Sequence, residues 1–179
     1  PNYAYQNKGG LQFDKVSEDW GLNQEAFSQG AAYADFDLDG DLDLVVSNIN
    51  TEAYVLQNNA SSNSNHYLRI KPASPLPIFN TRAYLYTDGD QQMQELTNVR
   101  GIYSSSEQVF HFGLGQTTDI DSAVIVWPDG KRQLLKTPEV DQVITVDYQE
   151  ADKALAASSK KERMFQEITA ELGMEIRHE

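Results

Sequence analysis

The residues with the clearest potential for chemistry are five aspartates at every second position: Asp35, Asp37, Asp39, Asp41 and Asp43. Carboxylates at this density repel one another unless a cation lies among them. Calcium takes about six to eight oxygen ligands, and a loop can supply them with carboxylates at positions 1, 3, 5 and 9 and a backbone carbonyl at position 7. Residues 35–43 have this arrangement. The sequence therefore predicts a calcium-binding loop with these five aspartates as its metal residues.

The flanking residues indicate what kind of loop this is. Gly40 stands at position 6, where the absence of a Cβ permits a sharp turn at positive φ. An EF-hand would have a glutamate at position 12, where this chain has Val46. Residues 44–46 form an apolar, β-branched run, which favours a strand. We expect a strand, a calcium loop and a second strand; the alternative is an acidic surface loop that binds nothing.

Composition excludes several classes of protein. The chain has 179 residues, a formal net charge of −13 and no cysteine. Nucleic-acid binding needs clustered lysine and arginine, so we expect no nucleic-acid partner. Disulfides and thiolate metal sites are excluded. No run of about 18 apolar residues is present, so we expect no membrane span. No signal sequence is visible and the chain opens within a strand pattern, so we expect a fragment of a longer secreted or cell-surface protein.

Short apolar runs separated by turn residues predict an all-β fold. The runs are residues 67–70, 83–86, 123–127 and 143–146, and the turns are residues 8–10, 88–90 and 128–130. Residues 127–131 should form a tight hairpin, because proline presets φ and Asp-Gly accommodates positive φ. Residues 60–65 have the composition of a linker. Residues 150–163 are rich in helix formers and predict a short C-terminal helix.

Two pairs of similar segments within the chain indicate a repeated β-unit. Residues 13–22 and 165–174 share their aromatic, β-branched, hydroxyl and glycine positions without gaps. Residues 5–7 parallel residues 56–58, and each triplet is expected to follow an apolar strand. Repetition of a small β-unit is typical of propeller blades.

Residues 30–58 resemble an FG-GAP or VCBS repeat, through the acidic loop and the apolar run that follows it. The resemblance implies a β-propeller blade, as in the integrin α-subunit head, with calcium in the loop. Two departures are evident: two residues separate Phe27 from Gly30 in the Phe-Gly start, and residues 48–50 (Asn-Ile-Asn) stand in place of Gly-Ala-Pro.

The second half resembles the ASPIC/UnbV domain, which commonly follows such repeats. Residues 95–101, 110–115 (Phe-His-Phe-Gly-Leu-Gly) and 120–130 (ending Trp-Pro-Asp-Gly) carry the resemblance. Residues 79–83 lack the family's Gly-x-Gly-Ala. The resemblances imply three parts: a partial blade with its calcium loop over residues 1–62, a β-sandwich-like ASPIC/UnbV domain over 66–148, and a helical linker with the start of another repeat over 149–179.

Other candidate sites offer less chemistry. His111 lies between two phenylalanines and could be a base, but a hydrogen-bonded structural histidine at a strand end is favoured. Residues 104–106 are three serines outside any Gly-x-Ser-x-Gly motif. Trp127 and residues 100–103 could form an aromatic platform for sugars, although core packing is the commoner role of such residues. We expect no catalytic residues and no organic cofactor.

Two functions are compatible with this pattern. The favoured one is a non-catalytic, calcium-stabilised binding or adhesion module of a large extracellular repeat protein, with an unidentified protein or glycan ligand. The alternative is a glycan-processing or other hydrolytic role that uses the aromatic surface near Arg100 and Trp127. A blade taken alone would expose apolar faces, for which the candidates are Phe27, Tyr33, Leu44 and Val46, so we also expect weak, salt-promoted homodimerisation.

Overall fold

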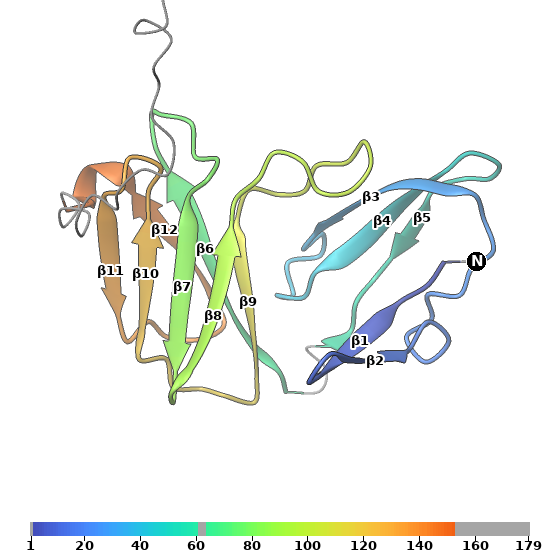
Figure 1. Ribbon diagram of the computed structural model, residues 1–179, viewed down its shortest axis with the longest axis horizontal. Helices are drawn as coiled ribbons and strands as arrows, with labels where there is room; N and C mark the ends of the chain where they lie inside the picture. Colours follow the sequence, from blue (N-terminus) through green and yellow to red (C-terminus); the bar gives the residue numbers. More distant parts are fainter. Residues whose placement is uncertain (1, 61–63, 153–179) are drawn as a thin grey trace, which may run out of the picture.

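The computed structural model describes residues 2–60 and 64–152, and these residues are almost entirely strand and turn (Figure 1). The all-β prediction is therefore confirmed for the described part of the chain. The expected C-terminal helix falls mostly outside it, because residues 153–179 are not among the described residues. The last described elements are a 3-10 turn, η2 (Tyr148–Glu150), and a bridge between Asp152 and Arg132.

The N-terminal part holds two small antiparallel sheets. One is the hairpin of β1 (Tyr5–Gly9) and β2 (Gln12–Lys15). The other has the order β3-β4-β5, from β3 (Ser28–Ala34), β4 (Asp43–Asn48) and β5 (Tyr54–Leu56). The acidic loop connects β3 to β4, as the strand–loop–strand prediction requires.

The expectation that residues 5–7 follow an apolar strand is wrong. Residues 5–7 lie inside β1, whereas Leu56 ends β5 and the next two residues follow the strand. The cause is local pairing: residues 5–7 pair with β2 across a tight turn, while Asn58 donates its backbone N–H to the Asp43 carboxylate (2.8 Å). The other pair of similar segments is residues 13–22 and 165–174, and residues 165–174 lie outside the described residues.

The C-terminal part begins with a four-stranded antiparallel sheet of order β11-β10-β7-β8. Its strands are β7 (Arg82–Thr87), β8 (Asp90–Glu95), β10 (Ser122–Val126) and β11 (Arg132–Lys136). The tight hairpin expected at residues 127–131 joins β10 to β11. The Trp127 N–H donates to the Lys131 carbonyl (2.9 Å), and Gly130 has φ +87°.

A three-stranded sheet of order β12-β6-β9 faces the four-stranded one. It comprises β6 (His66–Ala73), β9 (Phe110–Gly115) and β12 (Gln142–Asp147), with β12 parallel and β9 antiparallel to β6. Side chains alternate between the two faces of a strand, so Leu68 and Ile70 point inward while the residues between and before them point outward.

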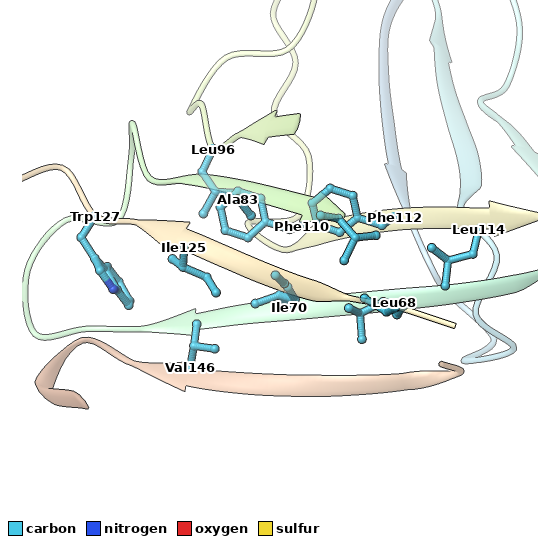
Figure 2. Close-up of a cluster of buried hydrophobic side chains, with 13 residues drawn as sticks. Leu68, Ile70, Ala83, Leu96, Phe110, Phe112, Leu114, Ile125, Trp127 and Val146 are labelled. Atoms are coloured by element: carbon cyan, nitrogen blue, oxygen red, sulfur yellow. The ribbon is translucent and has the colours of Figure 1, made fainter. Parts of the chain in front are cut away.

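The two sheets share one core of thirteen buried hydrophobic residues (Figure 2). Trp127 belongs to it with 2% of its surface exposed, and its indole meets the Tyr148 ring edge-on (5.3 Å between centroids, 84°). The suggestion that Trp127 could form a surface platform for sugars is therefore wrong. Residues 123, 125 and 127 share one face of an extended run, and that face is the inner one.

The apolar surface of the N-terminal part is only partly as expected. Phe27 is 71% exposed, and Tyr33 and Leu44 are half-buried. Val46, another candidate for a face that neighbouring blades would cover, is buried in this chain. It lines a hollow together with Ile102 and Ser104, which belong to a loop of the C-terminal part.

We expect residues 66–148 to fold on their own and residues 1–62 not to. The whole buried core cluster lies between residues 68 and 146, whereas the buried hydrophobic side chains described in residues 2–60 are Val16 and Val46. A sheet this small needs neighbours to bury its faces. Thermal melts of the two fragments, expressed separately, check this. A cooperative transition from 1–62 alone would contradict it.

Candidate metal centre

Three carboxylates of the acidic loop, residues 35–43, converge. Asp35, Asp37 and Asp39 each offer an oxygen atom, and these atoms lie within 4.8 Å of one another. Backbone N–H groups hold the side chains in place: Asp39 donates to Asp37 Oδ1 (3.4 Å), and Asp41 donates to Asp39 Oδ1 (2.9 Å). Gly40 has φ +98°, the positive value expected for it. Such a set of hard oxygen donors suits Ca²⁺ or Mg²⁺.

Asp43, the fourth predicted carboxylate ligand, accepts backbone hydrogen bonds in this structure and does not converge with the other three. It is 2% exposed, and both of its oxygens accept backbone hydrogen bonds, Oδ2 from Phe36 (2.9 Å) and Oδ1 from Asn58 (2.8 Å). These bonds fasten the start of the loop to the end of β5. Asp41 and Asp43 are not part of the converging group, so the structure brings together three of the five predicted aspartates.

Asp35 supplies an independent indication that a cation fits here. Its side chain is 2% exposed and its Oδ2 accepts from Arg69 Nη1 at 2.8 Å. Its Oδ1 is buried and has no hydrogen-bond partner among the described residues. A buried carboxylate oxygen without a partner is costly, on the order of 1–3 kcal/mol, and a metal ion would satisfy it.

Two residues outside the loop contact its carboxylates, and the sequence analysis did not identify them as site residues. Gln57 Nε2 donates to Asp37 Oδ2 (2.5 Å). Arg69 comes from β6, 34 positions after Asp35, and its Nη2 also meets Glu107 Oε2 (2.5 Å). Arg69 lies between Leu68 and Ile70 in β6. Because the side chains of these two residues face the core, the side chain of Arg69 faces outward, toward the loop. The sequence feature that could have identified Arg69 as a site residue is an arginine between apolar residues of a predicted strand.

The acidic loop therefore lies at a junction between the two parts of the chain. We define the junction by Asp35, Gly40, Tyr67, Arg69 and Glu107. An ideal Cβ placed on Gly40 would stand 2.0 Å from Tyr67 Cε1, so the loop backbone rests directly on the tyrosine ring. Burial raises the pKa of the Tyr67 hydroxyl, and the nearby carboxylates of Asp141 and Asp35 raise it further.

The outer edge of β3 is also in contact with the C-terminal part. The loop between β8 and β9 reaches toward β3 (Figure 1), and two of its serines accept hydrogen bonds from it. Ser104 Oγ accepts from the Ala31 N–H (3.0 Å), and Ser106 Oγ accepts from the Tyr33 N–H (3.4 Å). These bonds, with the Arg69–Asp35 pair, fix the N-terminal sheet against the sandwich.

His111 lies opposite Arg69 in the β6–β9 register and stacks on Tyr67 (5.9 Å between centroids, 6°). The expected ring hydrogen bond is not found on Nδ1, which is buried without a partner in the described residues. The ring stack on Tyr67 and two hydrogen bonds to the backbone hold His111 in place instead. The His111 N–H donates to Gln94 Oε1, and Gln94 Nε2 donates to the His111 carbonyl. Burial lowers the pKa of His111, and the Arg69 guanidinium lowers it further.

The comparisons with known proteins agree with the sequence patterns of the C-terminal part. Residues 71–153 match the family described as ASPIC and UnbV. Cartilage acidic protein 1 of Mus musculus is 31% identical over 140 residues, which cover 74% of this chain and 22% of that protein. The Homo sapiens protein of that name is 30% identical over 135 residues, with 71% and 20% covered. The Xenopus tropicalis protein is 30% identical over 130 residues, with 69% and 20% covered.

The chain thus spans about a fifth of the length of the curated relatives it matches. In the part of the chain that the structure describes, no helix has the length and hydrophobicity needed to cross a membrane. The ASPIC/UnbV resemblance is confirmed for the C-terminal part: residues 71–153 match that family, and most of the chain is similar to a portion of cartilage acidic protein 1.

Proposed function

We propose that this chain is a non-catalytic binding or adhesion module of a larger extracellular protein, and that calcium stabilises it through the acidic loop. One observation carries the proposal. Asp35 Oδ1 is buried and has no hydrogen-bond partner among the described residues, and Asp35 is one of the three aspartates, with Asp37 and Asp39, whose carboxylate oxygens converge. A bound cation would supply the positive charge that these carboxylates need.

Each residue of the loop has a role in this proposal. Asp35, Asp37 and Asp39 would hold the ion, and Gly40 makes the turn that brings them together. Asp43 closes the loop by accepting two backbone N–H groups. Gln57 orients Asp37. The carbonyl of Asp41 and the carboxylate of Asp43 are the further ligands that the sequence motif proposes.

The N-terminal part, in this proposal, is a partial β-propeller blade of the FG-GAP or VCBS type. The antiparallel β3–β4 pair with the acidic loop between its strands supports this assignment. So do the large apolar side chains that this part exposes, among them Trp20, Phe27 and Val55, because neighbouring blades would cover such surface. The relatives are about five times longer than the matched segment, which leaves room for them.

An extracellular location is the third element of the proposal. The word "cartilage" in the name of the relatives supports it. A net charge of −13 suits a calcium-rich medium, since the chain has many carboxylates that can bind cations. The ligand is proposed to be a protein or a glycan.

The hydrolytic alternative gains no support from the described residues. Trp127, half of its aromatic platform, is in the core. Two carboxylates at the junction, Asp35 and Glu107, are both paired with the Arg69 guanidinium, which lies between them. A glycosidase needs two carboxyl groups that flank a substrate cleft, one of them in an apolar setting.

We expect calcium to raise the melting temperature. An extracellular-type site with a dissociation constant of about 0.1 mM, in about 1 mM calcium, adds roughly 1.4 kcal/mol by mass action. For a chain of this size that is about 3–6 °C. Differential scanning calorimetry with calcium and with EDTA measures the shift.

Asp39→Ala should abolish the calcium response, because it removes one of the three converging carboxylates. Asp90→Ala, at the exposed first residue of β8, is the matched control and should keep the full shift. Identical melting of the original chain in EDTA and in calcium would refute the proposed calcium role.

A further inference from the structure

We propose that Arg69 acts as the resident counter-ion of the acidic loop and sets its calcium affinity. This inference rests on the calcium role proposed above and adds to it a residue from the other part of the chain. Arg69 would keep the loop folded without calcium, and it would weaken calcium binding when the ion is present.

The geometry places Arg69 where a cation is needed. Its side chain is 7% exposed and meets the 2% exposed Asp35 side chain at 2.8 Å. Removing the partner of a buried carboxylate is strongly destabilising, because it leaves a buried charge without compensation. Asp37 and Asp39 stand within 4.8 Å of Asp35 and add to the negative charge. In the absence of calcium, Arg69 is the positive charge that makes this convergence tolerable.

Arg69 cannot easily withdraw when an ion arrives. Its backbone is in the middle of β6, paired with β9 on one side and β12 on the other. Its second terminal nitrogen is held by Glu107, whose side chain is 40% exposed. The guanidinium is therefore fixed at one oxygen of Asp35, and the partnerless oxygen of the same carboxylate is left for the ion.

Two cations that share one carboxylate repel each other, and this repulsion is weakly screened because the pair is buried. The fixed charge of Arg69 therefore lowers the affinity of the loop for calcium. Calcium affinity of such loops depends on the count of ligand charges, so cancelling one of them shifts the site toward weak binding. Arg69 lies in the sandwich and the ligands lie in the N-terminal part, so the affinity is set across the junction.

The test compares Arg69→Gln with Arg69→Lys in the full 179-residue chain. Glutamine is polar but carries no charge, whereas lysine keeps the charge. Isothermal titration with Ca²⁺ alone, in metal-free buffer, should show Arg69→Gln binding at least about tenfold tighter than the original chain. Arg69→Lys keeps the positive charge and should stay closer to the original chain than Arg69→Gln does, although one ammonium group does not replace both contacts of the guanidinium, to Asp35 and to Glu107.

Arg82→Gln is the matched control for net charge. Arg82 pairs with Glu95 at 2.9 Å on the surface of the same sandwich, and its side chain is 49% exposed. This substitution lowers the net charge by the same one unit as Arg69→Gln, but it removes no charge from the junction. Its calcium affinity should equal that of the original chain.

Thermal melts keep the test decisive if Arg69→Gln is poorly folded without calcium. The proposal requires a lowered melting temperature in EDTA and a larger rise on adding calcium than in the original chain. An unchanged or weaker affinity in Arg69→Gln, or a variant that calcium does not refold, overturns the role of Arg69 alone. Absence of binding in both the original chain and Arg69→Gln overturns the calcium role of the loop as well.

Discussion

Replacing Phe112 with alanine is expected to lower the free energy of unfolding by about 3–5 kcal/mol. The ring is fully buried between the two sheets, in the core cluster (Figure 2). Its removal loses the transfer free energy of the aromatic group and leaves a cavity that flanking strands cannot close, because their backbones are hydrogen-bonded into the sheets. Urea denaturation followed by circular dichroism measures the loss.

Leu134→Ala is the matched control for this truncation. Leu134 lies in β11 of the same sandwich, but it is 53% exposed. We expect a loss of less than about 1 kcal/mol. Similar losses for the two variants would mean that the cluster around Phe112 is not the core that holds the sandwich together.

Gly40→Ala is expected to have the second large effect, and it acts at the junction. Alanine at φ +98° is strained, by about 1–2 kcal/mol, and its Cβ would stand 2.0 Å from the Tyr67 ring. Either the loop or the ring must move, which costs roughly a further 1–3 kcal/mol. Chemical denaturation should show the sum, and calcium binding should weaken with it because Asp39 and Asp41 flank Gly40.

The chain offers both a control and a rescue for Gly40→Ala. Gly89 has φ +83° in the β7–β8 turn and nothing within 4 Å of an added Cβ, so Gly89→Ala reports the backbone strain alone. In a Tyr67→Ala background the contact is gone, and Gly40→Ala should then cost no more than Gly89→Ala. Equal costs of the two glycine substitutions in the original chain would show that the Tyr67 contact carries no energy.

Features that depend on neighbouring residues could be predicted from the sequence. The strand–loop–strand unit around Gly40, the hairpin at residues 127–131 and the inward face of β6 follow from turn chemistry and from the period of two in a strand. The buried position of Trp127 was available by the same rule, because it continues the face of residues 123 and 125.

Features that depend on distant contacts could not be predicted in this way. The pairing of Arg69 with Asp35 joins a residue of β6 to a residue of the acidic loop, and nothing near either residue indicates the other. The engagement of both Asp43 oxygens depends on where β5 ends, since Asn58 reaches Asp43 only after the chain has folded back. Position in the acidic motif shows that a carboxylate is present, but not which hydrogen bonds it already accepts.

The two serines that contact β3 have a consequence for how this chain meets other chains. An edge strand normally offers a row of N–H groups to which an extended peptide or a second copy can add as a further strand. Here the N–H groups of Ala31 and Tyr33 are already bonded to Ser104 and Ser106. β3 is therefore closed to strand addition without any charged or proline residue along it, and cross-β assembly through this edge would first have to detach the β8–β9 loop.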